Sequence, residues 1–103
     1  LAFRPDLFAG RTVLVSGGGS GIGRAMAYCF ARLGANVMIC GRRAEKLEET
    51  AAGIRRLLGR EIACRPMTIR DPEQVRALVA ETWERFGALD HLVNNGGGQY
   101  PQA

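Results

Sequence analysis

The chain has 103 residues, which suits one small domain or part of a larger one. Charged residues make up 23% and hydrophobic residues 47% of the chain, and no apolar run approaches the ~18–20 residues that a membrane span needs, so the sequence is neither that of a disordered chain nor that of a membrane helix. The net charge of +4 is the difference between 14 Lys and Arg residues and 10 Asp and Glu residues. The cations are scattered along the chain, which argues against nucleic acid as a partner and suits an anionic small-molecule ligand.

The first predicted unit is a strand, a glycine loop and a helix. A β-branched run predicts a buried strand over 12–16, and residues 17–21 form a glycine-rich loop. Apolar residues then recur at spacings of three and four, which predicts one buried helix face. That face comprises Ile22, Ala25, Met26, Cys29, Phe30 and Leu33. Gly34 ends the helix, and a second strand is predicted over 36–40.

A second helix and a third strand follow. The apolar stripe of this helix comprises Leu47, Ala51, Ile54 and Leu58. Gly53 lies inside the helix, where glycine costs about 1 kcal/mol relative to alanine, and Gly59 ends it. The third strand is predicted over 62–67, and Pro66 near its end indicates an edge strand or a strand terminus.

The third helix has a clear start. Asp71 can cap it, Pro72 suits its first position, and Gln74 can complete a capping box. Its apolar positions are Val75, Leu78, Val79, Thr82, Trp83 and Phe86. Gly87 ends the helix, and a fourth strand is predicted over 91–94.

Four strands therefore alternate with three helices, without a linker or a second domain between them. Consecutive strand–helix–strand units have right-handed crossovers. The pattern predicts an α/β fold in which helices cover both faces of one parallel sheet.

The three cysteines, Cys29, Cys40 and Cys64, lie in apolar segments. The odd count excludes a complete internal disulfide framework, and the chain has no CxxC pair. We expect buried, reduced thiols in a cytoplasmic protein, with no metal site. The first residues lack the pattern of a secretion signal.

The glycine loop fits one of three nucleotide-binding spacings. GxGxxG fails in every frame, and GxxxxGK[ST] fits Gly18 and Gly23 but is followed by Arg24. GxxxGxG fits Gly17, Gly21 and Gly23. A loop of this kind between a strand and a helix presents free backbone amides to an anion. The alternative is a tight turn without a ligand.

Two motifs resemble those of the short-chain dehydrogenase/reductases. The TGxxxGxG loop of that family appears here as residues 16–23 with Ser16 in place of Thr, and its NNAG motif appears as Asn94, Asn95, Gly96 and Gly97. The resemblance covers the whole chain but only about the N-terminal half of a typical member. It implies the first four strands and three helices of a Rossmann-type doubly wound sheet, as an NAD(P)-binding domain over 1–103 that stops before the catalytic segment.

The end of the second strand indicates the cofactor. An acidic residue there accepts hydrogen bonds from the ribose hydroxyls of NAD, whereas this chain has Arg42 and Arg43 after Gly41. Because a guanidinium group suits a phosphate, the pair predicts NADP. The alternative is that both arginines merely begin a solvated helix.

The resemblance assigns further residues to the cofactor. It places Ser20, Gly21 and Ile22 at the pyrophosphate. It also places Thr68 and Ile69 beside the adenine, although Thr68 departs from the usual Asp, and Asn94 and Gly96 beside the adenosine ribose, with Gly97 further along the cofactor. Residues 94–100 together with 68–70 resemble the peroxisomal trans-2-enoyl-CoA reductases and related bacterial acyl-CoA-type reductases.

The catalytic YxxxK pair of that family is absent from this chain. Tyr28 is followed four residues later by Arg32, and the corresponding position after Tyr100 lies beyond residue 103. We therefore expect no catalytic residue here, and a chain that is inactive alone. The resemblance implies the cofactor-binding half of an NADP(H)-dependent oxidoreductase that acts on a carbonyl or enoyl thioester, with acyl-CoA among its substrates and a homo-oligomeric full-length form. The alternative is a non-catalytic nucleotide-binding or assembly module.

Overall fold

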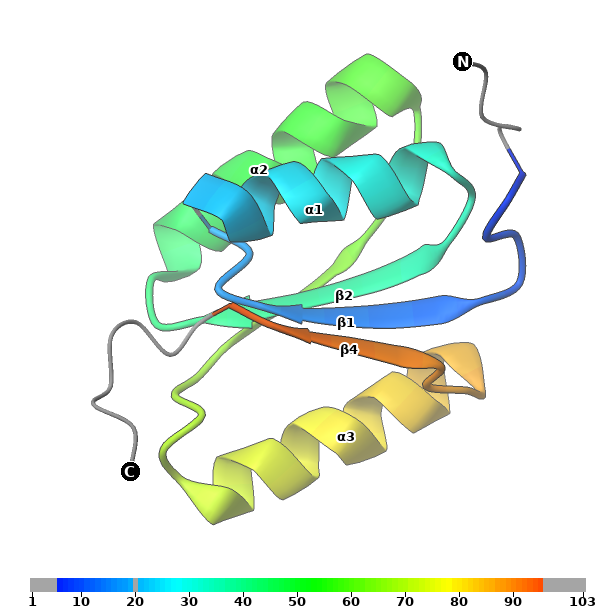
Figure 1. Ribbon diagram of the computed structural model, residues 1–103. Helices are drawn as coiled ribbons and strands as arrows, with labels where there is room; N and C mark the ends of the chain where they lie inside the picture. The colour runs from blue at the N-terminus through cyan, green and yellow to red at the C-terminus, as the bar shows by residue number, and fades with distance from the viewer. Residues whose placement is uncertain (1–5, 20, 96–103) are drawn as a thin grey trace.

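The computed structural model describes residues 6–19 and 21–95 (Figure 1). Strands and helices alternate in the predicted order. They are β1 (Thr12–Ser16), α1 (Gly21–Arg32), β2 (Asn36–Gly41), α2 (Ala44–Leu58), β3 (Ala63–Pro66), α3 (Pro72–Phe86) and β4 (His91–Asn94). Among the described helices, none is both long and apolar enough to cross a membrane.

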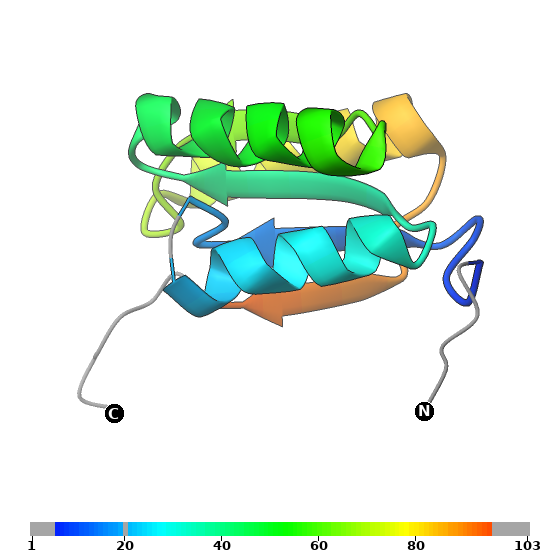
Figure 2. The ribbon, with the colours of Figure 1, turned by 90° about the horizontal axis from the view of Figure 1, so that it is seen from above.

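The four strands form one parallel sheet in the order β3-β2-β1-β4. The chain steps outward from β1 through β2 to β3 and then returns to the other side of β1, so the strand order reverses at β1. Helices α1 and α2 cover one face and α3 covers the other (Figures 1 and 2). This arrangement confirms the predicted Rossmann-type fold, and β3 lies at an edge as Pro66 indicates.

Alternate residues of the central strands serve the two faces of the sheet. Val13, Val15 and Ile39 pack with α1 and α2 in one cluster. Leu14 and Met38 pack with α3 in the other. Every residue of β1 is buried, which is expected for a central strand with helices on both sides.

The predicted buried face of α1 is only partly right: Phe30 packs against the core, but other residues of that face are exposed. Ile22 is 68% exposed, and Ala25 and Cys29 are exposed as well. The buried residues of α1 are instead the small ones, Gly23, Ala27 and Ala31. The helix lies so close to the sheet and the glycine loop that only small side chains fit between them.

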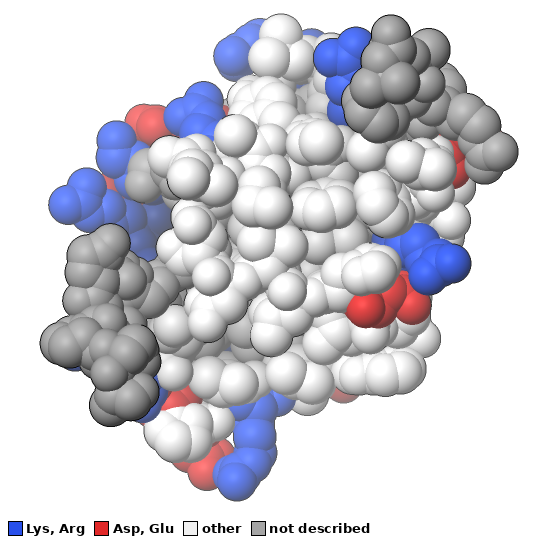
Figure 3. Space-filling view, viewed as in Figure 1, with Lys and Arg blue, Asp and Glu red and all other residues white. Residues whose placement is uncertain are grey.

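The exposed stripe of α1 has two consequences. Cys29 is an exposed thiol, so the expectation that all three cysteines are buried is also wrong; Cys40 is buried and Cys64 half-buried. Large apolar side chains are also exposed. They include Ile22 of α1 and Leu92 of β4, and Leu92 is 64% exposed. Figure 3 shows a largely uncharged face on this side of the molecule.

The predicted start and end of α3 are confirmed, but its predicted capping box is not. The Asp71 side chain caps α3 by accepting a hydrogen bond of 3.0 Å from the Glu73 amide. The predicted capping box does not form, because Gln74 accepts a 3.0 Å hydrogen bond from the amide of Thr68 instead and donates to the Asp71 carboxylate at 3.1 Å. Gly87 ends the helix with a φ of 74°.

Candidate functional site

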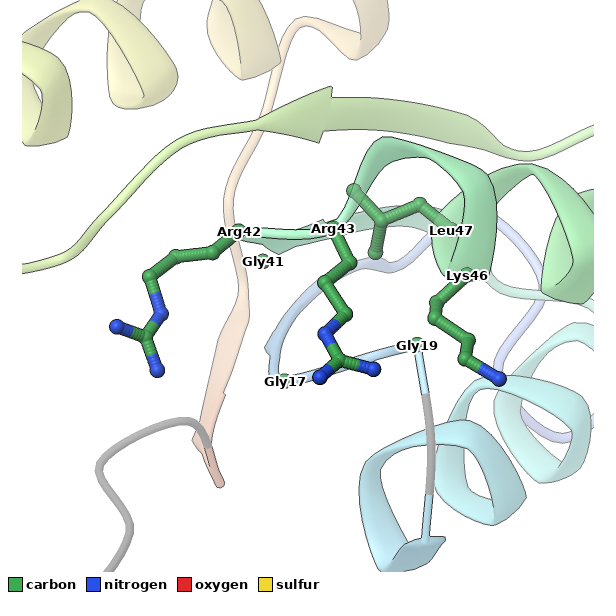
Figure 4. Close-up of a pocket in the computed structure, with 7 residues that line it drawn as sticks. All are labelled: Gly17, Gly19, Gly41, Arg42, Arg43, Lys46 and Leu47. Atoms are coloured by element: carbon green, nitrogen blue, oxygen red, sulfur yellow. The ribbon is translucent and has the colours of Figure 1, made fainter.

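A crevice opens where the carboxyl ends of β1 and β2 lie side by side. Its volume is about 650 Å³, within the roughly 300–1,000 Å³ of most small-molecule sites. It lies beside the strand at which the sheet order reverses, the usual position for a ligand in an open α/β sheet. Its lining comprises Gly17, Gly19, Gly41, Arg42, Arg43, Lys46 and Leu47 (Figure 4).

The glycine loop leaves β1 in a backbone conformation that favours glycine. Gly17 has a φ of 76°. Its amide donates a 2.8 Å hydrogen bond to the Cys40 carbonyl, and the amide of Gly18 donates to the same oxygen at 3.3 Å. The end of β2 therefore supports the start of the loop, and Gly17 and Gly19 line the crevice.

Gly23 allows α1 to begin directly against this loop. A Cβ atom at this position would overlap the carbonyl oxygen of Gly17 and would lie 3.0 Å from Asn95 Nδ2. Since backbone atoms form the first contact, no side-chain rotation could relieve it. The third glycine of the GxxxGxG spacing is thus explained by packing, and it brings the first turn of α1 to the edge of the crevice.

Two side-chain hydrogen bonds hold the loop and connect the two motifs. Thr50 of α2 is fully buried, and its hydroxyl donates to the Gly18 carbonyl at 3.0 Å. Ser16 at the end of β1 donates to Asn94 Oδ1 at 3.2 Å. The glycine loop and the Asn94 motif, about 75 residues apart in sequence, therefore meet at neighbouring strand ends.

The crevice is strongly cationic. Its lining includes Arg42, Arg43 and Lys46 and no acidic residue. None of the three cations forms an ion pair within residues 6–19 and 21–95. Arg43 is also the N-cap residue of α2, and its side chain makes no capping hydrogen bond. The first amides of α2 and three cations thus all favour an anion at this point.

The predicted site residues divide between the crevice and its surroundings. Gly17, Arg42 and Arg43 line the crevice itself. Gly21 and Ile22 lie exposed in the first turn of α1. Predicted residues Ser20, Gly96 and Gly97 lie outside the described residues.

A second, apolar pocket receives two other predicted residues. It measures about 290 Å³ and lies between the sheet and α3, with Ile69 and Asn94 in its lining. Thr68 is half-buried, and its hydroxyl accepts a 3.2 Å hydrogen bond from the Arg70 amide. The structure therefore does not bring Thr68 and Ile69 into the lining of the cationic crevice.

Lys46 was missed by the reasoning from sequence. It lies three residues after Arg43, so the two share a face of α2. This spacing was the available signal, because a helix beginning at Ala44 places residues 43 and 46 on the same side. Gly19, Gly41 and Leu47 of the lining were also not assigned to the site.

Two other described side chains that could carry chemistry, Cys40 and His91, hold structural positions. Burial raises the pKa of the Cys40 thiol to about 11, so this thiol stays protonated and is a poor nucleophile. His91 packs edge to face with Phe8 at 5.9 Å, as a structural residue would. Within the described part of the chain, no group of three His, Cys, Asp or Glu residues could hold a metal ion.

Comparison with known proteins identifies a family. The family model described as short chain dehydrogenase matches residues 11–103. The peroxisomal 2,4-dienoyl-CoA reductase [(3E)-enoyl-CoA-producing] of Danio rerio is 36% identical over 98 residues, a match that covers 95% of this chain and 33% of that protein. The chain thus spans about a third of the length of this relative.

Solved structures agree. The citronellol catabolism dehydrogenase AtuB of Pseudomonas aeruginosa PAO1 is 49% identical, with a TM-score of 0.84 and coverage of 89% of this chain and 38% of that one. The L-sorbose reductase of Gluconobacter frateurii, complexed with NADPH and L-sorbose, is 30% identical, with a TM-score of 0.85 and coverage of 97% and 38%.

Proposed function

The chain belongs to the short chain dehydrogenase family, and on that premise we propose that the intact protein is an NADP(H)-dependent oxidoreductase. This chain supplies its cofactor-binding half, as a Rossmann domain over 1–103 that precedes the catalytic segment. When bound, the nicotinamide supplies or accepts the hydride. The residues of this chain bind and orient the adenosine end of the cofactor.

The observation that carries the proposal is the cationic crevice at the end of β2. The 2′-phosphate is the group that distinguishes NADP from NAD, and it is a dianion near neutral pH. Arg42 and Arg43 stand where an acidic residue would repel it, and both lack ion-pair partners among the described residues. The lining therefore fits a phosphorylated dinucleotide, and the NADPH complex of the related sorbose reductase supports the same choice.

The remaining cofactor contacts are proposed from the position of the loop. Gly21 and Ile22, together with Ser20, would bind the diphosphate at the start of α1, where free amides and the helix dipole favour an anion. Asn94, with Gly96 and Gly97, would lie against the ribose and the rest of the cofactor. Thr68 and Ile69 stay candidates for the adenine.

For the substrate we propose a carbonyl compound or an enoyl thioester, with acyl-CoA among the candidates. The support is the relationship to an enzyme named as a dienoyl-CoA reductase. An assay of the intact protein with NADPH against enoyl-CoA, 3-ketoacyl thioesters and simple ketones tests this class. We also propose a homo-oligomeric form of the intact protein and a reducing compartment such as the cytoplasm. The support for the compartment is that all three cysteines are free thiols.

The cofactor choice is tested by binding. We expect the intact protein to bind NADPH at least tenfold more tightly than NADH, and Arg42→Ala to remove most of this preference by weakening NADPH alone. Arg11→Ala is the matched control, since Arg11 is an exposed cation at the other end of β1. Equal affinities for the two cofactors that Arg42→Ala leaves unchanged would refute the proposal.

A non-catalytic nucleotide-binding or assembly module is the second candidate, because the cationic crevice by itself requires only that a nucleotide binds. The two candidates differ in one cheap observation, namely whether the reading frame continues past Ala103 into a Ser-containing strand and a YxxxK motif. A stop codon at that point would favour the module. Continuation into those motifs would favour the oxidoreductase.

A further inference from the structure

Lys46 lines the crevice but has no role in the function proposed above. It lies in the first turn of α2, three residues after the N-cap residue Arg43. Both arginines are exposed, whereas Lys46 is half-buried. Figure 4 shows its side chain running from α2 past Gly19 of the glycine loop, on the side of the crevice that Arg42 does not reach.

Gly19 makes room for the stem of this lysine. A Cβ atom at position 19 would lie 2.8 Å from Lys46 Cβ, closer than real Cβ atoms approach one another. Without that atom, the Cβ of Lys46 lies against the loop, and the half-buried side chain lines the crevice. A lysine can cover its stem in this way and leave its ammonium group in solvent.

The backbone of Lys46 is tied to the same loop. The Thr50 hydroxyl lies 3.0 Å from the Gly18 carbonyl oxygen and 3.2 Å from the Lys46 carbonyl oxygen. Its single proton is shared between these two acceptors. Residue 46 and the glycine loop are therefore held at a set separation by a fully buried group, which limits where the ammonium can reach.

The charge of Lys46 is not neutralised by the described part of the chain, where it forms no ion pair. It shares the crevice with Arg42 and Arg43. Three like charges at one crevice repel one another, and an anion bound among them relieves that repulsion. A phosphate monoester carries about −1.5 to −2 charges at neutral pH, which suits more than one cation.

We propose that Lys46 is a specificity-determining residue whose ammonium group, beside Arg43, binds the 2′-phosphate of NADP(H). This inference rests on the proposed function. The 2′-phosphate is favoured over the shared diphosphate because Lys46 projects from the helix that follows β2, the strand whose end faces the ribose 2′ position in folds of this kind. The diphosphate belongs instead to the first turn of α1.

The test is the binding of NADPH and of NADH to the intact protein carrying Lys46→Met. This change removes the charge and keeps the length of the stem. We expect the NADPH Kd to rise about tenfold, a typical effect of losing one charge-assisted hydrogen bond, and the NADH Kd to change less than twofold. Lys46→Arg should retain the preference for NADPH. In turnover, Lys46→Met should raise KM for NADPH and leave kcat unchanged.

Arg56→Met is the matched control for net charge, because Arg56 is an exposed cation in the last turn of the same helix. Equal weakening of NADPH and NADH by Lys46→Met would assign the lysine to the diphosphate and overturn the inference. So would an equal effect of Arg56→Met, or no effect of Lys46→Met on a protein that prefers NADPH. A parent protein without that preference would instead refute the proposed function.

Discussion

Gly53 lets α1 and α2 pack closely because it has no side chain. A Cβ atom at this position would overlap the Tyr28 hydroxyl oxygen and lie 3.2 Å from Cζ of the same ring. Gly53→Ala should gain up to about 1 kcal/mol of helix propensity. The obstructing oxygen is the outer end of a half-buried side chain that borders an open pocket, so moving it should cost near the lower end of the about 1–3 kcal/mol that overpacking typically costs. We therefore expect a net loss of up to about 1 kcal/mol in the free energy of unfolding.

The oxygen atom of Tyr28 is responsible for most of this cost. Tyr28→Phe removes it and leaves only the tight 3.2 Å contact with the ring carbon. In the Tyr28→Phe background, Gly53→Ala should be neutral or stabilising, which corresponds to a coupling of about 1–2 kcal/mol in the double-mutant cycle. Equilibrium urea unfolding of the four proteins measures it. An equal loss from Gly53→Ala in both backgrounds would show that the Tyr28 oxygen is not the obstacle.

Two further predictions concern the support of the loop and the thiols. Thr50→Val should lower the free energy of unfolding by about 1–2 kcal/mol, because the Gly18 carbonyl loses its buried donor; Thr50→Ser should restore most of it, and urea unfolding with no difference between the two variants would contradict this. At pH 8 a disulfide-exchange reagent should label Cys29 first, as peptide mass mapping will show, because burial raises the pKa values of Cys40 and Cys64 to about 11. Fast labelling of all three thiols at pH 8 would contradict this assignment. The folded state holds the protons of Cys40 and Cys64 more tightly than the unfolded state does, so the stability that the two thiols confer should be complete below pH 9 and lost between about pH 9 and 11.

The strands, the helix ends and the fold class could be predicted because their signals are local. A β-branched run indicates a strand wherever it lies, and Asp71 followed by Pro72 indicates a helix start through contacts within four residues. The alternation of these elements then leaves few topologies open. The positions of Arg42 and Gly17 in one crevice follow from the same logic, because the ends of adjacent parallel strands lie side by side.

The orientation of α1 could not be predicted in this way. Two stripes run along this helix, one of larger apolar residues and one containing Gly23, Ala27 and Ala31. Hydrophobicity favours the first stripe, but the helix lies too close to the loop for large side chains, as the contact of Gly23 with the Gly17 carbonyl shows. That distance is a property of the tertiary structure, and a pattern of spacings does not contain it.

The role of α2 connects the packing of the fold with the chemistry of its site. One face of this helix fixes its position in the core through Leu47 and Ile54, which are buried against the sheet. Its first turn carries Lys46, and one turn later Thr50 holds the glycine loop. The groups proposed to bind the 2′-phosphate and the loop proposed to bind the diphosphate are therefore positioned by a single rigid element. A shift of α2 would disturb both at once, so selectivity for the phosphate depends on the core of the domain as much as on the charges at its surface.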